Sequence, residues 1–271
     1  MKTILKYCSF LFAVLLMSSC EEVVDVKLDT APPRLVVDAA INWIKGTTGS
    51  EQTIYLTTTA DYFGTEIPKV SGATVFITNS SNVDFPFLEV AAGEYSCTNF
   101  QPVLGETYTL TVVAQGVTYK ATEKMISVPS IQNIEQKNDG GFTGDQIELK
   151  TYYNDPGDED NYYLFRYIRN STLAVFRTSD DRFVQGNTTF DIYSHEDLEA
   201  NDKVNIRLMG ISRQYYNYMN ILISVVNGGG GPFQTPPATV RGNVINQNNQ
   251  ANYPLGYFSL SEVDETTYTV Q

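Results

Sequence analysis

The sequence has little of the chemistry on which most enzymes and metalloproteins depend. Its 271 residues include one histidine, one tryptophan and three cysteines. Two of the cysteines, Cys8 and Cys20, lie in an N-terminal segment that resembles an export signal. Only Cys97 is then left for the folded chain, so neither an internal disulfide nor a zinc site built from His and Cys is expected. Cys97 lies in the strand-like segment EYSCTNF, which favours a small buried side chain.

Positive charge is also scarce. The chain has 18 Lys and Arg against 31 Asp and Glu, a net charge of −13. An acidic surface repels phosphate backbones, which excludes nucleic acid as an expected partner. Hydrophobic residues make up 42% of the chain, enough for a buried core. After the first 20 residues no apolar run reaches the length of about 20 residues that a membrane-spanning helix needs.

Recognisable catalytic motifs are missing as well. The sequence has no phosphate-binding glycine loop, no H-E-x-x-H motif and no G-x-S-x-G motif. His195 is the only side chain whose usual pKa suits acid–base catalysis near neutral pH, and no nucleophile can be paired with it. The favoured interpretation of His195 is a surface loop residue, and we expect no enzymatic activity.

The N-terminus carries the most specific signal. Lys2 and Lys6 precede an uncharged run over residues 7–17, and two small residues follow before Cys20. This order is typical of a secretory signal, and a cysteine directly after the small residues resembles the acylation motif of bacterial lipoproteins. We therefore expect residues 1–19 to be a signal peptide, Cys20 to carry lipid such as palmitate, and residues 20–32 to be a tether.

Two acidic residues, Glu21 and Glu22, directly follow the cysteine. Acidic residues at this position resemble the surface-export signal of Bacteroidota lipoproteins, and the alternative is a solvated tether that happens to be acidic. The expected location is the outer membrane through the lipid on Cys20, at the cell surface or otherwise on the periplasmic face.

The first expected module covers residues 33–128. Its strand-like runs alternate apolar and hydroxyl side chains and are separated by turn residues. Gln115 and Gly116 join two of these runs, and the pair predicts a tight hairpin because glycine permits positive φ. Pro129 marks the boundary, because proline cannot donate to a strand ladder. The expected strands are 35–41, 53–59, 73–78, 93–95, 107–114 and 117–120.

The second expected module covers residues 129–271 and contains one amphipathic helix. Residues 212–227 place apolar side chains at helical spacing, with Ser212 suited to cap the helix and Gly228 to end it. A β-hairpin is the alternative. The glycine- and proline-rich segment 227–237 follows as a loop. The expected strands are 131–136, 145–153, 162–169, 188–193, 203–209, 239–245, 255–260 and 266–270. The predicted fold is mainly β, with two β-sandwich-like modules in tandem.

An acidic turn over residues 154–161 is the sharpest local cluster. Asp155, Asp158 and Asp160 are candidate ligands for calcium, because Ca²⁺ takes oxygen ligands from such turns. The alternative is a solvated turn without a cofactor, since Asp-Pro-Gly has strong turn chemistry. No other metal site and no binding residues can be named from the sequence.

Tyrosine is the abundant aromatic residue, with 18 copies that include adjacent pairs at 152–153, 162–163 and 215–216. Adjacent residues of a strand face opposite sides, so one member of each strand pair is expected to leave the core. Exposed tyrosine is favoured at binding surfaces, because its ring is apolar and its hydroxyl forms hydrogen bonds.

Two resemblances follow from these motifs. VSGATVFITN, GEYSC and LGETYTLTVVAQGVTYKATEKM resemble transthyretin-like and carboxypeptidase-regulatory-like β-sandwiches. The order of the Cys20 motif, PPRLVVDAAI, YNDPGDEDNYY, SRQYYNYMN, PFQTPPATVRGNV and LGYFSL resembles the domain of unknown function 4249 family of Bacteroidota lipoproteins. The family resemblance implies an outer-membrane lipoprotein, often encoded near a TonB-dependent transporter, and it carries over no catalytic residue.

The expected function is therefore a membrane-anchored binding or accessory module, with a TonB-dependent outer-membrane β-barrel as the expected partner. A structural or adhesive surface lipoprotein is the alternative. A hydrolase with carboxylates dispersed in the sequence ranks below both.

Overall fold

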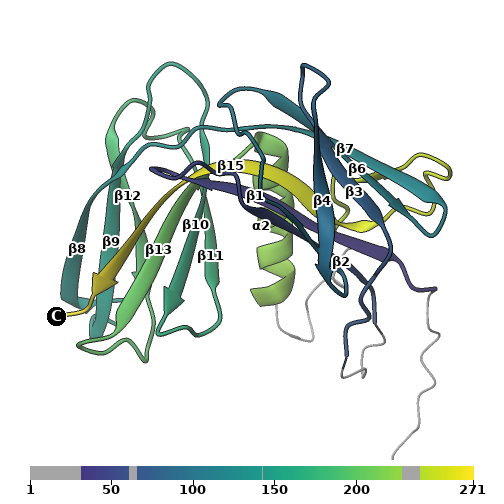
Figure 1. Ribbon diagram of the computed structural model, residues 1–271. Helices are drawn as coiled ribbons and strands as arrows, with labels where there is room; N and C mark the ends of the chain where they lie inside the picture. Colours follow the sequence, from purple (N-terminus) through teal and green to yellow (C-terminus); the bar gives the residue numbers. More distant parts are fainter. Residues whose placement is uncertain (1–31, 61–65, 142, 228–238) are drawn as a thin grey trace, which may run out of the picture. The chain divides into compact units, whose positions relative to one another are not determined.

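The computed structural model describes residues 32–60, 66–141, 143–227 and 239–271. The described chain is mainly β with one α-helix, as predicted (Figure 1). The elements are β1 (Leu35–Ile44), β2 (Gln52–Thr58), β3 (Thr74–Thr78), β4 (Asp84–Ala91), β5 (Glu94–Cys97), β6 (Thr107–Ala114), β7 (Val117–Lys124), β8 (Ile131–Gly140), β9 (Gln146–Asn154), β10 (Tyr162–Arg169), β11 (Val175–Asp180), β12 (Thr188–Ser194), β13 (Lys203–Gly210), α2 (Arg213–Asn227), β14 (Ile245–Asn246) and β15 (Leu255–Thr269).

Twelve strands form one hydrogen-bonded series in the order β11-β10-β13-β15-β1-β2-β5-β4-β3-β6-β7-β14. The other three form a sheet in the order β12-β9-β8. The predicted hairpin between β6 and β7 is confirmed, with φ of 52° at Gln115 and 76° at Gly116.

Strand β15 is the element that was predicted least well from the sequence. We predicted two strands, 255–260 and 266–270, and the structure has one continuous strand. Its first part pairs in parallel with β1, from Leu255 opposite Val36 to Val263 opposite Ile44. Its second part pairs antiparallel with β13 as far as Thr269. The polar residues between the two predicted strands stay in the ladder because β13 takes over the pairing there.

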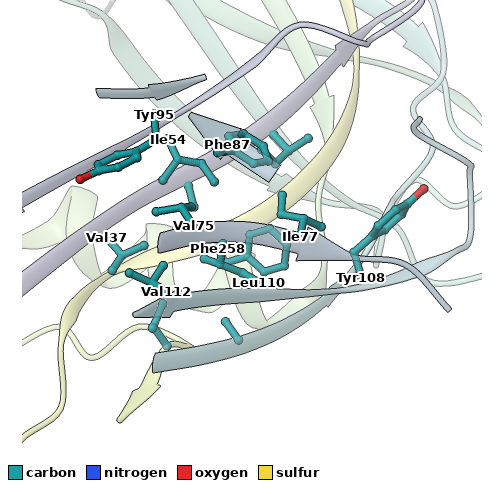
Figure 2. Close-up of a cluster of buried hydrophobic side chains, with 14 of the residues drawn as sticks. Val37, Ile54, Val75, Ile77, Phe87, Tyr95, Tyr108, Leu110, Val112 and Phe258 are labelled. Carbon is teal, nitrogen blue, oxygen red and sulfur yellow. The ribbon is translucent and has the colours of Figure 1, made fainter. Parts of the chain in front are cut away.

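The first hydrophobic core lies among β1 to β7 and the start of β15 (Figure 2). In β1, Val37, Ala39 and Ile41 are fully buried and point into this core, while the residues between them lie on the opposite face. Phe258 and Leu260 of β15 complete it from a distant part of the sequence. Cys97 is buried here, as predicted.

The second core is built largely from aromatic side chains. Tyr153, Tyr163, Phe165 and Tyr167 are buried, and the ring centroids of Tyr167 and Tyr193 lie 4.7 Å apart. The expected alternation of paired tyrosines is confirmed in the strands, where Tyr152 and Tyr162 are only half-buried.

Along the sequence, residues of the first core are followed by residues of the second core close to the predicted boundary. Before the C-terminal segment, the first core ends at Met125 and the second begins at Val128. The C-terminal segment serves both, because β15 contributes to the first core while Val270 just beyond it contributes to the second. The domain boundary at residue 128 stays a prediction.

The predicted helix is confirmed as α2, and the cap is the predicted one. The hydroxyl of Ser212 accepts a hydrogen bond of 3.2 Å from the backbone N–H of Tyr215. Gly228 and the rest of the loop at 228–238 lie outside the described residues. The helix packs on β10 and β11 and, through Met219, joins a third apolar cluster with Leu164 and Val263.

The prediction of a strand over residues 239–245 is wrong, since the only paired residues there are Ile245 and Asn246, which form β14. At Asn243 the side-chain amide takes the place of backbone pairing with a neighbouring strand. The amide donates to the backbone O of Phe258 at 2.8 Å and accepts from the backbone N–H of Phe258 at 2.9 Å. A Cβ on Gly242 would lie 1.6 Å from the backbone O of Gly256, so only glycine lets the chain approach β15 this closely.

Candidate functional site

A groove lies between helix α2 and the sheet face that the first core leaves uncovered. Its volume is about 870 Å³, within the range of about 300–1,000 Å³ that is usual for ligand pockets. It is lined by Val36, Val37, Asp38, Ala40, Asn42, Thr53, Tyr55, Leu164, Arg166, Ala174, Val175, Phe176, Arg207, Met209, Tyr215, Tyr218, Met219, Leu222, Ile223, Val226, Asn227, Gly256, Tyr257, Ser259 and Ser261.

The period of the strands explains why the groove has a mixed lining. Successive side chains of a strand face opposite sides. In β1 the odd-numbered residues from Val37 to Ile41 fill the first core, so Asp38 and Asn42 face the groove. In β15, Ser259 and Ser261 face the groove between the core residues Phe258 and Leu260. The same strands thus supply an apolar layer on one side and polar groups on the other.

Three tyrosines form an aromatic cluster where the helix meets the sheet. The ring centroid of Tyr257 in β15 lies 4.7 Å from that of Tyr215 and 4.8 Å from that of Tyr218. Burial raises the pKa of Tyr215 to about 12 and also raises the pKa values of Tyr218 and Tyr257. All three hydroxyls therefore stay neutral at physiological pH and can act as hydrogen-bond donors.

A buried carboxyl group fixes this cluster to the start of the helix. Oε2 of Glu123 accepts a hydrogen bond of 3.0 Å from the hydroxyl of Ser212 and one of 3.3 Å from the hydroxyl of Tyr257. Burial raises the pKa of Glu123. Because Ser212 also caps α2, the hydrogen bonds of one side chain link the helix terminus, β7 and the aromatic cluster.

Asp38 is the carboxylate of the groove. It pairs in register with Tyr257 on one side and with Tyr55 on the other. Its side chain is open to the groove, yet the walls around it remove enough water to raise its pKa. No hydrogen bond or ion pair joins the Asp38 carboxylate to another residue within the described ranges.

Arg166 and Arg207 bring positive charge to the groove. They lie opposite each other on β10 and β13, and Glu265 of β15 lies opposite Arg207. Nε of Arg207 lies 2.5 Å from Oε2 of Glu265. Nε of Arg166 is buried without a hydrogen-bond partner in the part of the chain that the structure describes. Burial lowers the pKa of Arg166, and the neighbouring charge of Arg207 lowers it further.

The rim of the groove exposes apolar and aromatic side chains. Tyr55 is 43% exposed, Phe176 is 37% exposed and Val226 is 73% exposed. Phe176 lies opposite Arg166 in the pairing of β10 with β11, the edge strand of the twelve-strand series. Clustered exposure of such residues is typical of a binding surface.

The residues predicted as sites from the sequence lie elsewhere. Cys20 and the tether through residue 31 fall outside the described residues. Asp155 is 5% exposed, and its carboxylate accepts hydrogen bonds from the Tyr163 hydroxyl at 2.5 Å and from the Gly186 N–H at 3.1 Å. Asp158 and Asp160 are exposed. Across the described ranges, no three acidic, His or Cys side chains gather to hold a metal ion. Calcium at these residues stays a prediction, and Asp155 would have to give up its present hydrogen bonds.

His195 lies in the loop before β13, as expected. Its Nδ1 accepts a hydrogen bond of 3.2 Å from the backbone N–H of Asp197 and lies 3.7 Å from Oδ2 of the same residue. It does not line the groove.

The residues that line the groove were not predicted from the sequence. The available signal was a charged residue in the middle of a largely apolar strand, Asp38 in LVVDAAI and Arg166 in YYLFRYIR.

Within the described ranges, no helix combines the length and the apolar character that crossing a bilayer requires.

Comparison with known proteins gives one family. A family model described as Domain of unknown function (DUF4249) matches residues 21–267. No match is found among curated proteins.

The solved structures that resemble this chain have low TM-scores. A two-domain fibronectin type-III segment of chicken tenascin is 13% identical, with 59% of this chain and 85% of that chain covered and a TM-score of 0.21. Fibronectin domains FN1–FN3 of chicken CNTN1 are 12% identical, covering 68% of this chain and 63% of that one, with a TM-score of 0.26. A DUF4785 family protein of Legionella pneumophila is 8% identical over 65% of this chain and 52% of that chain, with a TM-score of 0.27. These likenesses carry no argument about function.

Proposed function

The chain belongs to the DUF4249 family, whose function is unknown, and from that premise we propose that it is a membrane-anchored binding lipoprotein. It acts as an accessory module of an outer-membrane transporter, and the groove beneath α2 is its ligand-binding site. The lipid on Cys20 holds it to the outer membrane, at the cell surface or on the periplasmic face.

The observation that carries this proposal is the character of the groove. Ligand sites are concave and mostly apolar, with a few polar groups that fix orientation. Here the apolar wall comes from α2 and β11, and the polar groups are Asp38, Asn42 and Arg166.

The anchor supports the accessory role. A binding module tethered beside its partner reaches an effective concentration in the millimolar range for a short flexible link. The transporter itself is inferred from the resemblance of the motifs to lipoproteins that are often encoded near TonB-dependent transporters.

The test is a pull-down of the full-length lipoprotein from detergent-solubilised outer membranes. We expect a TonB-dependent β-barrel to be recovered with it. The matched control is Cys20→Ser, which removes the lipidation site and is expected to recover less of the barrel. Recovery of the lipoprotein alone, in amounts that exclude a stoichiometric partner, would contradict the transporter role.

A structural or adhesive role is the second candidate, and exposed apolar side chains favour it. Leu173 and Phe183 are each 93% exposed, which is unusual for such large side chains. If these residues form an adhesive contact, Leu173→Ser and Phe183→Ser will reduce cell adhesion and leave transporter recovery unchanged. A hydrolase role ranks below both, and turnover of glycans or peptides in an activity screen would reverse that order.

A further inference from the structure

The groove carries opposite charges on two separate rows of side chains. One row runs across β15, β1 and β2 as Tyr257, Asp38 and Tyr55. The other runs across β11, β10 and β13 as Phe176, Arg166 and Arg207. Two strands of the series, β13 and β15, lie between β10 and β1, so neither charge neutralises the other directly.

The row on β10 requires an anion. Arg207 already has Glu265 as its partner. Arg166 makes no ion pair of its own within the described ranges, its Nε is buried without a hydrogen bond, and the nearby charges of Arg207 and Glu265 act on it with opposite signs. A buried donor without a partner is costly. A planar carboxylate matches the fork of N–H donors on a guanidinium and would remove that cost.

The row on β1 requires a cation or a hydrogen-bond donor. Asp38 faces the groove without a described partner, and the Tyr215 and Tyr218 hydroxyls stay neutral beside it.

The space between the two rows suits an extended ligand body. Ser259 and Ser261 supply hydroxyls along β15, while Met219, Leu222 and Ile223 of α2 form the apolar wall opposite. The residues of β10 and β1 are separated by three strand spacings, about 14 Å. Their register positions on β15, at Glu265 and Tyr257, are also eight residues apart, which adds an offset of roughly 26 Å along the strands. A free amino acid is too short to reach both charges, whereas an extended peptide advances about 3.3–3.6 Å per residue.

We propose that the groove binds a short linear peptide with free termini, its C-terminal carboxylate on Arg166 and its α-ammonium on Asp38. This inference rests on the proposed binding function and names the ligand class of the same site. An acidic oligosaccharide would satisfy Arg166 and leave Asp38 without a cation. A neutral oligosaccharide would use neither charge.

The test uses the full-length lipoprotein in detergent and a randomised pool of linear peptides of roughly eight to twelve residues, long enough to span both charges. The pool is offered in four forms: free, N-acetylated, C-amidated and capped at both ends. Equilibrium dialysis with mass spectrometry then measures which peptides the protein retains. We expect the free pool to bind at least tenfold more tightly than either singly capped pool.

Two variants test which residue binds which end of the peptide. Arg166→Gln is expected to lose the preference for a free carboxylate and to keep the preference for a free ammonium, and Asp38→Asn is expected to do the reverse. The controls are Arg241→Gln and Asp158→Asn, exposed residues outside the groove lining, which should change neither preference. If a groove variant fails to fold, the four pools still test the proposal on the unaltered protein.

Equal retention of all four pools, or of none, would overturn the peptide assignment. Tighter retention of an oligogalacturonate, lost in Arg166→Gln and kept in Asp38→Asn, would overturn it in favour of an acidic glycan. Neither result bears on the pull-down, so a failure of the ligand class is distinct from a failure of the accessory role.

Discussion

The hydroxyl of Tyr163 donates a hydrogen bond of 2.5 Å to Oδ1 of Asp155, and both side chains are almost completely buried. Asp155 opens the acidic turn that the sequence offered as a calcium candidate. In the fold it is a structural acceptor that joins β10 to the segment before β12, because its other oxygen accepts from the Gly186 N–H. The first carboxylate of the turn, that of Asp155, is thus held in place by hydrogen-bond donors of the protein itself.

Tyr163→Phe is expected to destabilise the protein by about 1–3 kcal/mol, because it leaves a buried acceptor without its donor. Urea unfolding monitored by circular dichroism measures the loss. The control is Tyr162→Phe on the opposite face of β10, where the ring contact with Tyr216 is kept and little change is expected. Because both variants keep the ring, equal losses would show that the hydrogen bond to Asp155 adds nothing to stability beyond the general effect of removing a hydroxyl.

Ser212→Ala is expected to cost about 1 kcal/mol through the lost helix cap. It also removes a donor to Glu123, so the start of α2 should fray and peptide binding in the groove should weaken. Ser224→Ala is the matched control, since its hydroxyl donates only to the carbonyl of Ile221 within the same helix. Hydrogen exchange at the first turn of α2 reports the difference, and identical exchange in the two variants would refute the capping role.

Glu123 predicts a pH dependence of stability. Burial raises the pKa of this carboxyl in the folded state above its ordinary value of 4.5. The stability that it contributes is therefore fully present below the ordinary pKa and is lost as the pH rises through the raised one. Compared with Glu123→Gln, the unaltered protein should lose stability as the pH rises above the ordinary value of 4.5 and through the raised pKa.

Glu106→Gln gives a control of opposite sign for that pH series. Hydrogen bonds led by the Ser80 hydroxyl lower the pKa of Glu106 in the folded state. The stability contributed by Glu106 is present above its ordinary pKa and is lost as the pH falls. Urea unfolding of both variants across the same pH series should therefore give differences that run in opposite directions, and parallel differences would contradict the assignment of Glu123 as a buried acid.

Cys20→Ser is expected to abolish acylation and release the protein from the membrane fraction. Metabolic labelling with an alkyne analogue of palmitate, followed by membrane flotation, measures both effects. Cys8→Ser should keep the label, because that residue belongs to the segment expected to be removed. Label retained in Cys20→Ser would place the lipid elsewhere and remove the basis of the proposed anchor.

Local patterns are sufficient to predict most of the strands and the helix. Alternating side chains place β6 and β7, helical spacing places α2, and the position of Ser212 just ahead of the helical spacing identifies it as the cap. The path of β15 is not predictable in this way, because its polar middle section is held by pairing with β13, and that partner cannot be read from β15 itself.

The groove is harder to predict for the same reason. Asp38 and Arg166 are far apart in the sequence, and each is visible there only as a charge in the middle of a largely apolar strand. Their common site depends on the order of the strands and on α2 covering one face of the sheet. Asn243 shows a related limit, since a strand-like segment there uses a side-chain amide in place of backbone pairing.

The pairing of β1 with β15 also sets an order of events during biosynthesis. The two strands are about 220 residues apart, and contacts between such distant segments are slow to form because the intervening chain must first be closed into a loop. As the chain is synthesised, β1 and the core behind it must wait for β15 before one edge is covered. An unpaired strand edge is prone to pair with other chains. Chaperones are thus expected to meet this protein as an open sheet until β15 has been synthesised.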